Sequence, residues 1–439
     1  MTHAVSQART RNYISQIKGS LVFKFLAVCS SFMAIPLMIR FLGQEQFGVW
    51  STVLSVMSWI VFFDLGLGVG LRNKLSESLA KEDFQQASAY ISSAYTLIGI
   101  LSFTLFAIVA CASFFIPWQR VFNTHAVSDT ALKITVVTSA FFIFLNFWIS
   151  LINQVLNAVQ KTSVVVFGQF LSNTLGLVLV YMLTKTADRS LSHLAAVYGF
   201  SLIASGLLLS LWYYRQNSGL LPRLFLDRRH VQPLLTLGLQ FFVIQIAVLI
   251  VFTTDKILIT QLLGPQQVTP YEIVFKLFSV ITLVHSLITA PLWSSYSDAY
   301  HRHDTAWLRT TLHRQLLIFG LISGAIVLLA VMARPLIGVW IGTDTTVSSG
   351  LIISMAALVL VTAWNNIFAT LVNGIGQIKV QLLSAVVAMT INIPLAIVLT
   401  GHFGLGVHGV VWATCISLSL FAVVGPLQVH VLLKKQKMV

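Results

Sequence analysis

Apolar segments of about twenty residues recur along the whole of this 439-residue chain, separated by short polar connections. A hydrocarbon core about 30 Å thick needs about 20 apolar residues for each helical crossing, so each segment is long enough to span a membrane. Only 9% of the residues are charged and 57% are hydrophobic, whereas water-soluble domains carry about a quarter charged residues. We therefore expect the lipid bilayer to be the solvent of this chain.

The hydropathy pattern predicts about twelve transmembrane helices, six in each half of the chain. The spans expected in the first half are Ser20–Leu42, Gln46–Val69, Ala87–Ile116, Ala131–Leu156, Ser163–Leu183 and Leu194–Tyr214. Those expected in the second half are Leu237–Leu263, Tyr271–Ser295, Gln315–Met332, Gly350–Leu371, Gln381–Leu399 and Gly409–Leu433. No connection between them has the length of a soluble domain. We expect an all-α fold of two six-helix bundles, residues 1–222 and 223–439.

Lys and Arg residues concentrate on alternate connections, and this predicts the orientation because cytoplasmic loops carry an excess of these residues. The basic set includes both ends of the chain. The opposite set contains only Arg40, Arg120, Lys185, Arg189 and Arg334 near the helix ends. We therefore expect both termini in the cytoplasm. The net charge of +14 reflects this topology, and since no basic stripe with interleaved aromatic residues forms a domain, nucleic acid is not an expected partner.

Sequence features recur about half a chain apart, which predicts an internal repeat. The segment Ile39–Gln46, at the first external turn, resembles Thr260–Gln267, and the residues around Asn157 resemble those around Asn373. Because each half has an even number of helices, the halves share one orientation and the repeat is parallel, with its axis along the membrane normal. Short Leu-Gly matches also arise by chance in apolar sequence, so the repeat rests on the matching helix pattern as well.

Charged residues within the predicted spans are candidate functional residues, because an ion in the hydrocarbon costs about 2.5–3.5 kcal/mol on insertion scales. Six of them are singled out, and these six fall on the leading helix pair of a half: Lys24, Asp64, Asp255, Lys256, Glu272 and Lys276. If those helix pairs face one another across a cavity, their cations suit an anionic substrate and their carboxylates suit a coupling ion.

Most of these charges also have a purely structural interpretation. Glu272 and Lys276 have the i, i+4 spacing of a helical ion pair. Lys24 is near enough to an interface to extend its ammonium group toward the headgroups. Asp64 lies close to Arg72 at the membrane surface. Both interpretations stay open for these residues on the sequence alone.

Asp255 is harder to explain as a structural residue. It precedes Gly264 by nine residues, which places it about 13 Å along the helix from the external turn, too deep for easy hydration. Lys256 leaves the helix in a different direction. We therefore expect Lys276 or Lys24 to be the partner of the Asp255 carboxylate.

Uncharged polar residues form one stripe on the fourth predicted helix and one on the tenth. The two stripes consist of Asn146, Ser150, Asn153 and Asn157, and of Thr362, Asn366 and Asn373. Such side chains either contact sugar hydroxyls in a watery cavity or bond to neighbouring helices, at under about 1 kcal/mol per contact on average. The balance slightly favours helix packing, and Asn146, Asn153 and Asn366 remain candidate substrate contacts.

Neither a metal nor a cofactor is expected. The three cysteines lie inside apolar segments without the spacing of a metal site: Cys29, Cys111 and Cys415. Asp298 and the segment His301–Asp304 contain ligand-type side chains, but they lie in a short cytoplasmic connection beside Arg302, which is typical of a solvated loop.

Short motifs at four places along the chain can be compared with those of known families. They are Leu42-Gly43 through Phe47-Gly48-Val49-Trp50, Asp64-Leu65-Gly66-Leu67-Gly68 with Leu71-Arg72-Asn73, Ile116-Pro117-Trp118 with Val121-Phe122-Asn123, and Pro291-Leu292-Trp293 with Tyr296-Ser297-Asp298-Ala299. Together they resemble the Wzx-type polysaccharide transporters, which are O-antigen and exopolysaccharide flippases. The likeness covers nearly the whole chain.

This resemblance implies membership of the multidrug, oligosaccharidyl-lipid and polysaccharide exporter superfamily, whose two six-helix bundles form a V around a central cavity. It implies a flippase for undecaprenyl-diphosphate-linked oligosaccharide units in the bacterial inner membrane, serving O-antigen, capsule or exopolysaccharide biosynthesis beside polymerase and chain-length proteins. The residues it implies for binding the diphosphate or acidic sugars are Lys24, Arg40 and Lys276. Those it implies for a coupling proton or sodium ion are Asp64, Asp255 and Glu272.

Two other functions stay open. A multidrug cation antiporter of the same superfamily needs acidic residues to dominate its cavity, whereas three lysines balance three acids among the six candidates and Arg40 is a surplus cation. A membrane glycan polymerase or ligase usually has a large external loop with reactive residues, and no predicted connection is of that kind. The transporter interpretation requires no covalent chemistry, so an enzyme is not expected.

Overall fold

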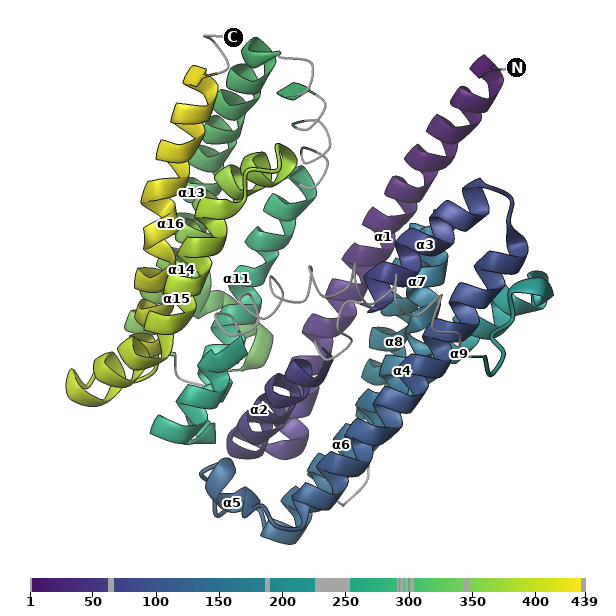
Figure 1. Cartoon of the computed structure of the whole chain (residues 1–439). Helices are drawn as coiled ribbons and strands as arrows, with labels where there is room; N and C mark the ends of the chain where they lie inside the picture. Colours follow the sequence, from purple (N-terminus) through teal and green to yellow (C-terminus); the bar gives the residue numbers. More distant parts are fainter. Residues whose placement is uncertain are drawn as a thin grey trace. The chain divides into compact units, whose positions relative to one another are not determined.

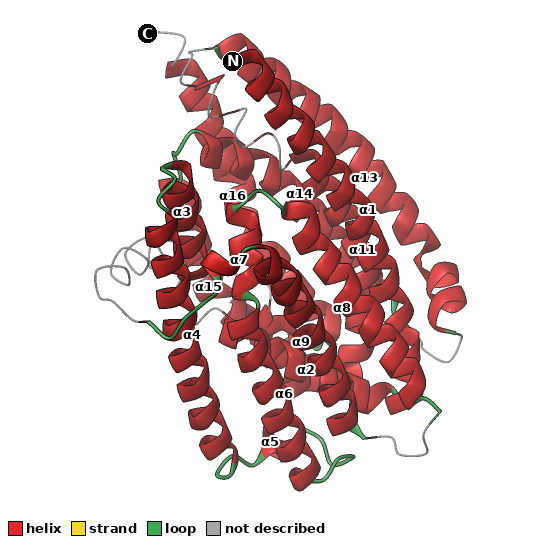
Figure 2. Cartoon of the chain, turned by 90° about the vertical axis from the view of Figure 1, so that its right-hand side faces the viewer, coloured by secondary structure: helices red, strands yellow, loops and turns green. Residues whose placement is uncertain are grey.

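The structure of the protein is a computed structural model. It describes residues 2–61, 67–185, 190–225, 253–289, 304–342 and 347–435, together with residues 292, 296, 299 and 300. Every regular element within these residues is helical (Figure 2). The expected all-α class is thereby confirmed.

Ten helical segments of the described residues are long and apolar enough to cross a membrane. They are Gly19–Leu42, Phe84–Ser113, Asp129–Ala158, Thr162–Leu183, Leu191–Gln216, Pro265–Thr289, Thr305–Ile341, Ser349–Gly374, Lys379–His402 and Val407–Lys434. The two predicted spans without a counterpart among them, Gln46–Val69 and Leu237–Leu263, both include residues outside the described part of the chain. The protein is a multi-pass membrane protein.

The chain divides into two compact units, Met1–Ile246 and Ala247–Val439. The helices of the first unit are α1 (Thr2–Leu42), α2 (Gln44–Val61), α3 (Leu67–Ala80), α4 (Phe84–Ser113), α5 (Trp118–Val121), α6 (Asp129–Ile149), α7 (Leu151–Ala158), α8 (Thr162–Leu183), α9 (Leu191–Gln216) and the short η2 (Ser218–Leu220). Within this unit, α1 packs along α8, and α6 packs on both α4 and α9 (Figure 1). The predicted domain boundary after residue 222 stays a prediction.

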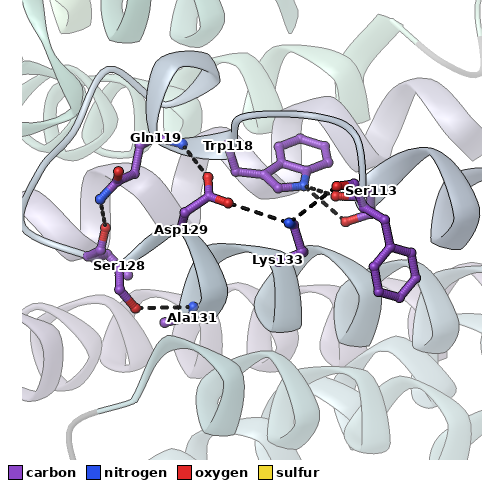
Figure 3. Close-up of polar contacts among 9 residues, drawn as sticks. Ser113, Trp118, Gln119, Ser128, Asp129, Ala131 and Lys133 are labelled. Atoms are coloured by element: carbon purple, nitrogen blue, oxygen red, sulfur yellow. Dashed lines mark hydrogen bonds and ion pairs between the residues drawn. The ribbon is translucent and has the colours of Figure 1, made fainter.

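Side chains at both helix ends fix the turn that joins α4 to α6 (Figure 3). The indole Nε1 of Trp118 donates a hydrogen bond to Oγ of Ser113 at 2.9 Å. The backbone N–H of Gln119 donates to the carboxylate of Asp129 at 3.2 Å, and Lys133 forms an ion pair with the same carboxylate at 3.5 Å. These contacts hold the C-terminal end of α4 beside the N-terminal end of α6.

The second unit is a bundle in which α16 lies against two other long helices. After a helix over residues 253–263, its elements are η3 (Pro265–Gln267), α11 (Val268–Thr289), α13 (Thr305–Ile341), α14 (Ser349–Gly374), α15 (Lys379–Ile397), η4 (Val398–His402) and α16 (Val407–Lys435). Helix α16 packs on α14 and α15, and α14 also packs on α11 and α13.

Helix α13 is much longer than the predicted span Gln315–Met332. It contains 37 residues, which at 1.5 Å per residue corresponds to about 55 Å, well beyond a hydrocarbon core of about 30 Å. The prediction was too short because Arg309 and Arg314 before the predicted span and Arg334 after it lower the local hydropathy without interrupting the helix.

Backbone geometry supports the internal repeat. Gly43 and Gly264 end the first described helix of each unit, with φ of 78° and 90°, a region that glycine enters without a Cβ clash. A second turn recurs at Gln160 and Gly376, with φ of 60° and 74°. In each copy of that turn the next N–H bonds to the carbonyl five residues earlier, at 2.8 and 2.9 Å. The two halves therefore share turn geometry where their sequences resemble each other.

Helix caps repeat as well. The carboxylates of Asp83 and Asp304 accept from the backbone N–H three residues later, at 2.8 and 2.9 Å, and so begin α4 and α13. The hydroxyls of Ser128 and Ser348 do the same for α6 and α14, at 3.3 and 3.2 Å. Each cap satisfies a backbone donor that the helix itself leaves unpaired. Corresponding helices of the two halves thus start in the same way.

Candidate functional site

A buried carboxylate lies among hydroxyl groups in the second unit. Asp255, on the helix over residues 253–263, is only 2% exposed. The phenol of Tyr271 on α11 donates a hydrogen bond to its Oδ2 at 3.1 Å, and the hydroxyl of Thr414 on α16 donates to its Oδ1 at 3.1 Å. Three helices therefore meet at this carboxylate.

A fourth helix completes the group. The side-chain amide of Asn392 on α15 donates to Oγ1 of Thr414 at 2.9 Å, and Asn392 is fully buried. Its Oδ1 accepts a hydrogen bond from no donor in the described part of the chain. The backbone carbonyl of Val410 lies 3.4 Å from the same threonine hydroxyl. Asp255, Tyr271, Asn392 and Thr414 are called the Asp255 cluster below.

The observed hydrogen-bond partners of Asp255 differ from the lysine partners predicted for it. Within the second unit, Lys276 is not the group that holds this carboxylate; the hydrogen bonds described for it come from two neutral hydroxyls. The prediction was wrong for Lys276 because it considered only charged partners, whereas hydroxyl donors far along the chain are brought together by helix packing. The alternative partner, Lys24, belongs to the first unit and stays a prediction. A buried carboxylate with neutral donors and a bare amide oxygen nearby presents oxygen atoms suited to a proton or a small hard cation.

Glu272 is held by a different lysine from the one that its helical spacing indicates. Its Oε2 lies 2.5 Å from Nζ of Lys256, and the two side chains are 17% and 21% exposed. The pair joins α11 to the helix that carries Asp255. This contact between consecutive helices neutralises both ions in a half-buried position.

A polar seam joins α1 to α8 in the first unit. The ammonium of Lys24 donates to Oε1 of Gln169 at 3.1 Å, and the amide of Asn173 donates to the carbonyl of Ala27 at 2.9 Å. Lys24 has three N–H donors, so one contact does not exhaust its capacity to bind an anion. The Lys24 ammonium thus contacts a side chain of the neighbouring helix α8, and its extension toward the headgroups stays a prediction.

The remaining sequence candidates are scattered over both units. Arg40 is exposed in the last turn of α1, and Asn146 and Asn153 are half-buried on α6 and α7. The amide of Asn366 on α14 donates to Oγ1 of Thr289 on α11 at 3.3 Å, which agrees with a role in helix packing. Asp64 lies outside the described residues.

Sequence reasoning missed Asn392 and Thr414. Asn392 is an amide in the middle of an apolar helix, where a polar group needs a partner from another helix. That isolation is the signal that was available. The partner itself, Thr414, could not be read from the pattern because threonine is common in membrane helices.

Two family profiles match the chain. The one described as "Polysaccharide biosynthesis protein" matches residues 19–297, and the one described as MatE matches residues 241–398. The two matches overlap and together extend over both units.

Curated relatives are similar over nearly their whole length. A Salmonella typhimurium protein named as an O-antigen transporter is 22% identical over 420 residues, with 92% of each chain covered. A Yersinia pseudotuberculosis protein named as an O-antigen export protein is 23% identical, with 91% of each chain covered. The Bacillus subtilis membrane protein EpsK is 25% identical, with 94% of this chain and 81% of EpsK covered.

Solved structures show the fold. An inward-facing multidrug resistance MATE family transporter of the MOP superfamily superposes with a TM-score of 0.80 at 16% identity, covering 96% of this chain and 99% of that one. An outward-facing structure of a transporter of that family gives 0.64 at 16% identity, covering 96% and 97%. The fold is that of MATE transporters. Since the first profile spans more than half of the sequence, the chain belongs to the polysaccharide biosynthesis protein family.

Proposed function

We propose that this protein is a flippase that moves undecaprenyl-diphosphate-linked oligosaccharide units across the bacterial inner membrane. The observation that carries the proposal is the family match over residues 19–297, joined by relatives that are named for O-antigen transport and export. The product enters O-antigen, capsule or exopolysaccharide biosynthesis. A polymerase and chain-length proteins act on the same repeat units after translocation.

Transport proceeds by alternating access. The diphosphate and the glycan enter from the cytoplasmic side while the prenyl chain stays on the lipid side, and a change of conformation then opens the head group to the other face. No bond of the substrate is made or broken. Lys24, Arg40 and Lys276 attract the diphosphate or acidic sugars, and Asn146, Asn153 and Asn366 offer amides to sugar hydroxyls.

Coupling belongs to the Asp255 cluster. The carboxylate of Asp255, the hydroxyl of Thr414 and the bare amide oxygen of Asn392 are hard oxygen donors of the kind that bind a proton or a sodium ion. An ion in this place offsets the cost of burying a carboxylate. An ion that binds the two conformations with different affinity shifts the equilibrium between them, which is what coupling requires. Asp64 and Glu272 are the further candidates for coupling.

The substrate site is tested with the Lys24→Gln, Lys276→Gln double variant in proteoliposomes that contain fluorescent lipid-linked oligosaccharide. We expect translocation to be abolished, because two cations for one diphosphate are removed. Lys434→Gln, at an exposed position of α16, is the control and should transport normally. Wild-type rates in the double variant would remove the proposed diphosphate site.

The coupling site is tested with Asp255→Asn under imposed sodium or proton gradients. The wild type is expected to respond to one of the two gradients, which identifies the ion. The variant should lose that response, because asparagine lacks the negative charge that binds the ion. Without a difference in ion affinity between the two conformations, the gradient shifts no equilibrium. Asp304→Asn is a matched control, since asparagine also caps a helix. A gradient response that survives in Asp255→Asn contradicts the assignment.

The similarity to MATE structures favours one alternative, a multidrug or cation antiporter. That function predicts drug-resistance and dye-efflux phenotypes, whereas a flippase predicts that a deletion strain accumulates single lipid-linked repeat units facing the cytoplasm. Outward-facing, unpolymerised units would instead indicate a membrane glycan polymerase or ligase. One analysis of lipid intermediates in a deletion strain therefore separates the three functions.

A further inference from the structure

An open apolar groove lies along α4 and α6 in the first unit. It has a volume of about 510 Å³, within the range of about 300–1,000 Å³ of small-molecule sites. Aromatic rings dominate its walls, with Phe103 and Phe106 from α4 and Phe141 and Trp148 from α6. The rings of Phe106 and Phe141 pack edge to face at 5.7 Å. The groove is therefore walled by rings that hold one another in place.

A tryptophan fixes the shape of the groove floor. The indole Nε1 of Trp148 donates to the backbone carbonyl of Tyr95 at 2.9 Å. The ring lies directly over Gly99, where an added Cβ would come within 3.2 Å of that nitrogen. The absence of a side chain at Gly99 thus lets the indole cross from α6 to α4. This makes the groove a preorganised feature of the two helices.

One end of the groove is formed by the segment that follows α9. The backbone N–H of Arg223 donates to Oγ of Ser92 at 3.1 Å, and that of Phe225 donates to Oγ1 of Thr96 at 3.2 Å. Between them, Leu224 lines the groove while remaining 96% exposed. Two hydroxyls of α4 therefore hold this segment at the groove end, so that the backbone of Arg223 lies beside the lining residue Leu224.

We propose that this groove binds the first isoprene units of a polyprenyl diphosphate, with the diphosphate beside Arg223; the inference rests on the proposed flippase function. Lipid acyl chains are as apolar as the groove, so burial alone does not favour one lipid over another. Selectivity comes from the fixed rings, which fit a stiff, methyl-branched chain at lower entropic cost than a flexible one. It comes also from the guanidinium, which matches phosphate geometry.

The length and polarity of the groove agree with this occupant. Tyr95 and Phe106, near its two ends, are eleven residues apart on one helix, which corresponds to about 16 Å. That distance accommodates a few isoprene units and leaves the rest of a long carrier in the bilayer. The Arg223 end is the end of α4 that the distribution of basic residues predicts to be cytoplasmic, the side on which the substrate is made.

The test uses the full-length protein in proteoliposomes and two photoreactive probes. One is a polyprenyl phosphate with a diazirine in its first isoprene units, and the other is phosphatidylethanolamine with a diazirine in an acyl chain. We expect the polyprenyl probe to label peptides of α4 and α6, and the acyl probe to label them weakly. Equal labelling by both probes, or polyprenyl labelling elsewhere, overturns the proposal.

Matched variants locate the occupant within the groove. Ile100→Trp fills the groove at a position that is 54% exposed, and Ile108→Trp on the same helix, 58% exposed and outside the groove, is its control. Arg223→Gln should weaken polyprenyl labelling about fivefold, as expected for one exposed ion pair, with Arg215→Gln as the control. Unchanged labelling in both Ile100→Trp and Arg223→Gln overturns the proposal.

Translocation of lipid-linked oligosaccharide is measured in the same vesicles, so the two hypotheses fail separately. If the wild type translocates the substrate but the label lies outside α4 and α6, the groove assignment falls and the flippase stands. If the polyprenyl probe labels the groove in a protein that does not translocate, the groove assignment stands and the flippase falls.

Discussion

At the scale of single residues, the hydroxyl of Thr414 decides how the Asp255 cluster is ordered. It has one proton, and it lies between the amide of Asn392 and the carboxylate of Asp255. Because the amide nitrogen can only donate, the hydroxyl accepts from Asn392. It donates its hydrogen bond to the carboxylate of Asp255 at 3.1 Å, and the carbonyl of Val410 is a more distant second acceptor at 3.4 Å. The direction of donation runs from α15 through α16 to the carboxylate, and the amide oxygen is left bare at the start of this chain.

Replacing Thr414 by valine should destabilise the protein and weaken ion binding together. The substitution keeps the volume but removes the hydroxyl, so a buried carboxylate oxygen and a buried amide lose their partner, at a cost of about 1–3 kcal/mol each. Thermal unfolding in detergent, with and without the coupling ion, measures both effects. The control is Thr390→Val, at an exposed hydroxyl that donates to the carbonyl of Val386 on its own helix. Equal stability of the two variants would contradict the central place of Thr414.

The same residues show where sequence reasoning ends. Periodicity and depth identified Asp255 as a residue that needs a partner. They could not identify Tyr271, Thr414 and Asn392 as its surroundings, since Asn392 and Thr414 lie on helices far along the chain and neither is charged. Lys256 was set aside as a partner for Asp255, and in the structure it pairs with Glu272 instead. Pairing across helices depends on helix rotation, which hydropathy does not contain.

At the scale of elements, hydropathy located the apolar helices closely. The predicted span Ser163–Leu183 corresponds to α8 (Thr162–Leu183) and Gly350–Leu371 to α14 (Ser349–Gly374). The failures occur where a helix leaves the apolar region, as in α13, or where a short break interrupts it, as between α6 and α7 at Ser150. Hydropathy reports the membrane contact of a helix, whereas its ends are set by caps such as Asp83, which no apolar pattern reveals.

Asp83→Ala should loosen the start of α4. The carboxylate satisfies a backbone donor of the first turn, and loss of such a cap costs about 1 kcal/mol. Hydrogen exchange of the amides at the start of α4 should accelerate by about fivefold, since 1.4 kcal/mol corresponds to tenfold. Asp83→Asn is the control and should retain protection, because asparagine caps equally well. Exchange that is the same in both variants would show that the cap contributes nothing measurable.

At the scale of the whole molecule, the parallel repeat predicts on which side of the membrane each turn lies. Gly43 and Gly264 mark equivalent turns, as do Gln160 and Gly376, and a parallel repeat puts equivalent turns on the same side of the membrane.

The candidate ion site draws all of its residues from the second unit, and the Lys24 seam draws all of its residues from the first. Equivalent halves have therefore acquired different polar side chains.

Single cysteines introduced at the equivalent turns measure that sidedness. In a background with Cys29, Cys111 and Cys415 replaced by serine, Gln44→Cys and Gln266→Cys should react with a membrane-impermeant maleimide only from the outside of intact cells. Gln160→Cys should react only after permeabilisation. Labelling of positions 44 and 266 from opposite sides would contradict the parallel repeat, and outside labelling of position 160 would contradict the predicted orientation.

The duplicated helix caps bear on how the protein is made. Asp83 and Ser128 lie within three residues of the backbone donors that they satisfy, and Asp304 and Ser348 do so in the second half. None of these caps depends on a contact with the other half of the chain. While the second half is still being translated, the ribosome has already released every residue that α4 and α6 need to begin, so these helices can form during insertion in the order in which they emerge.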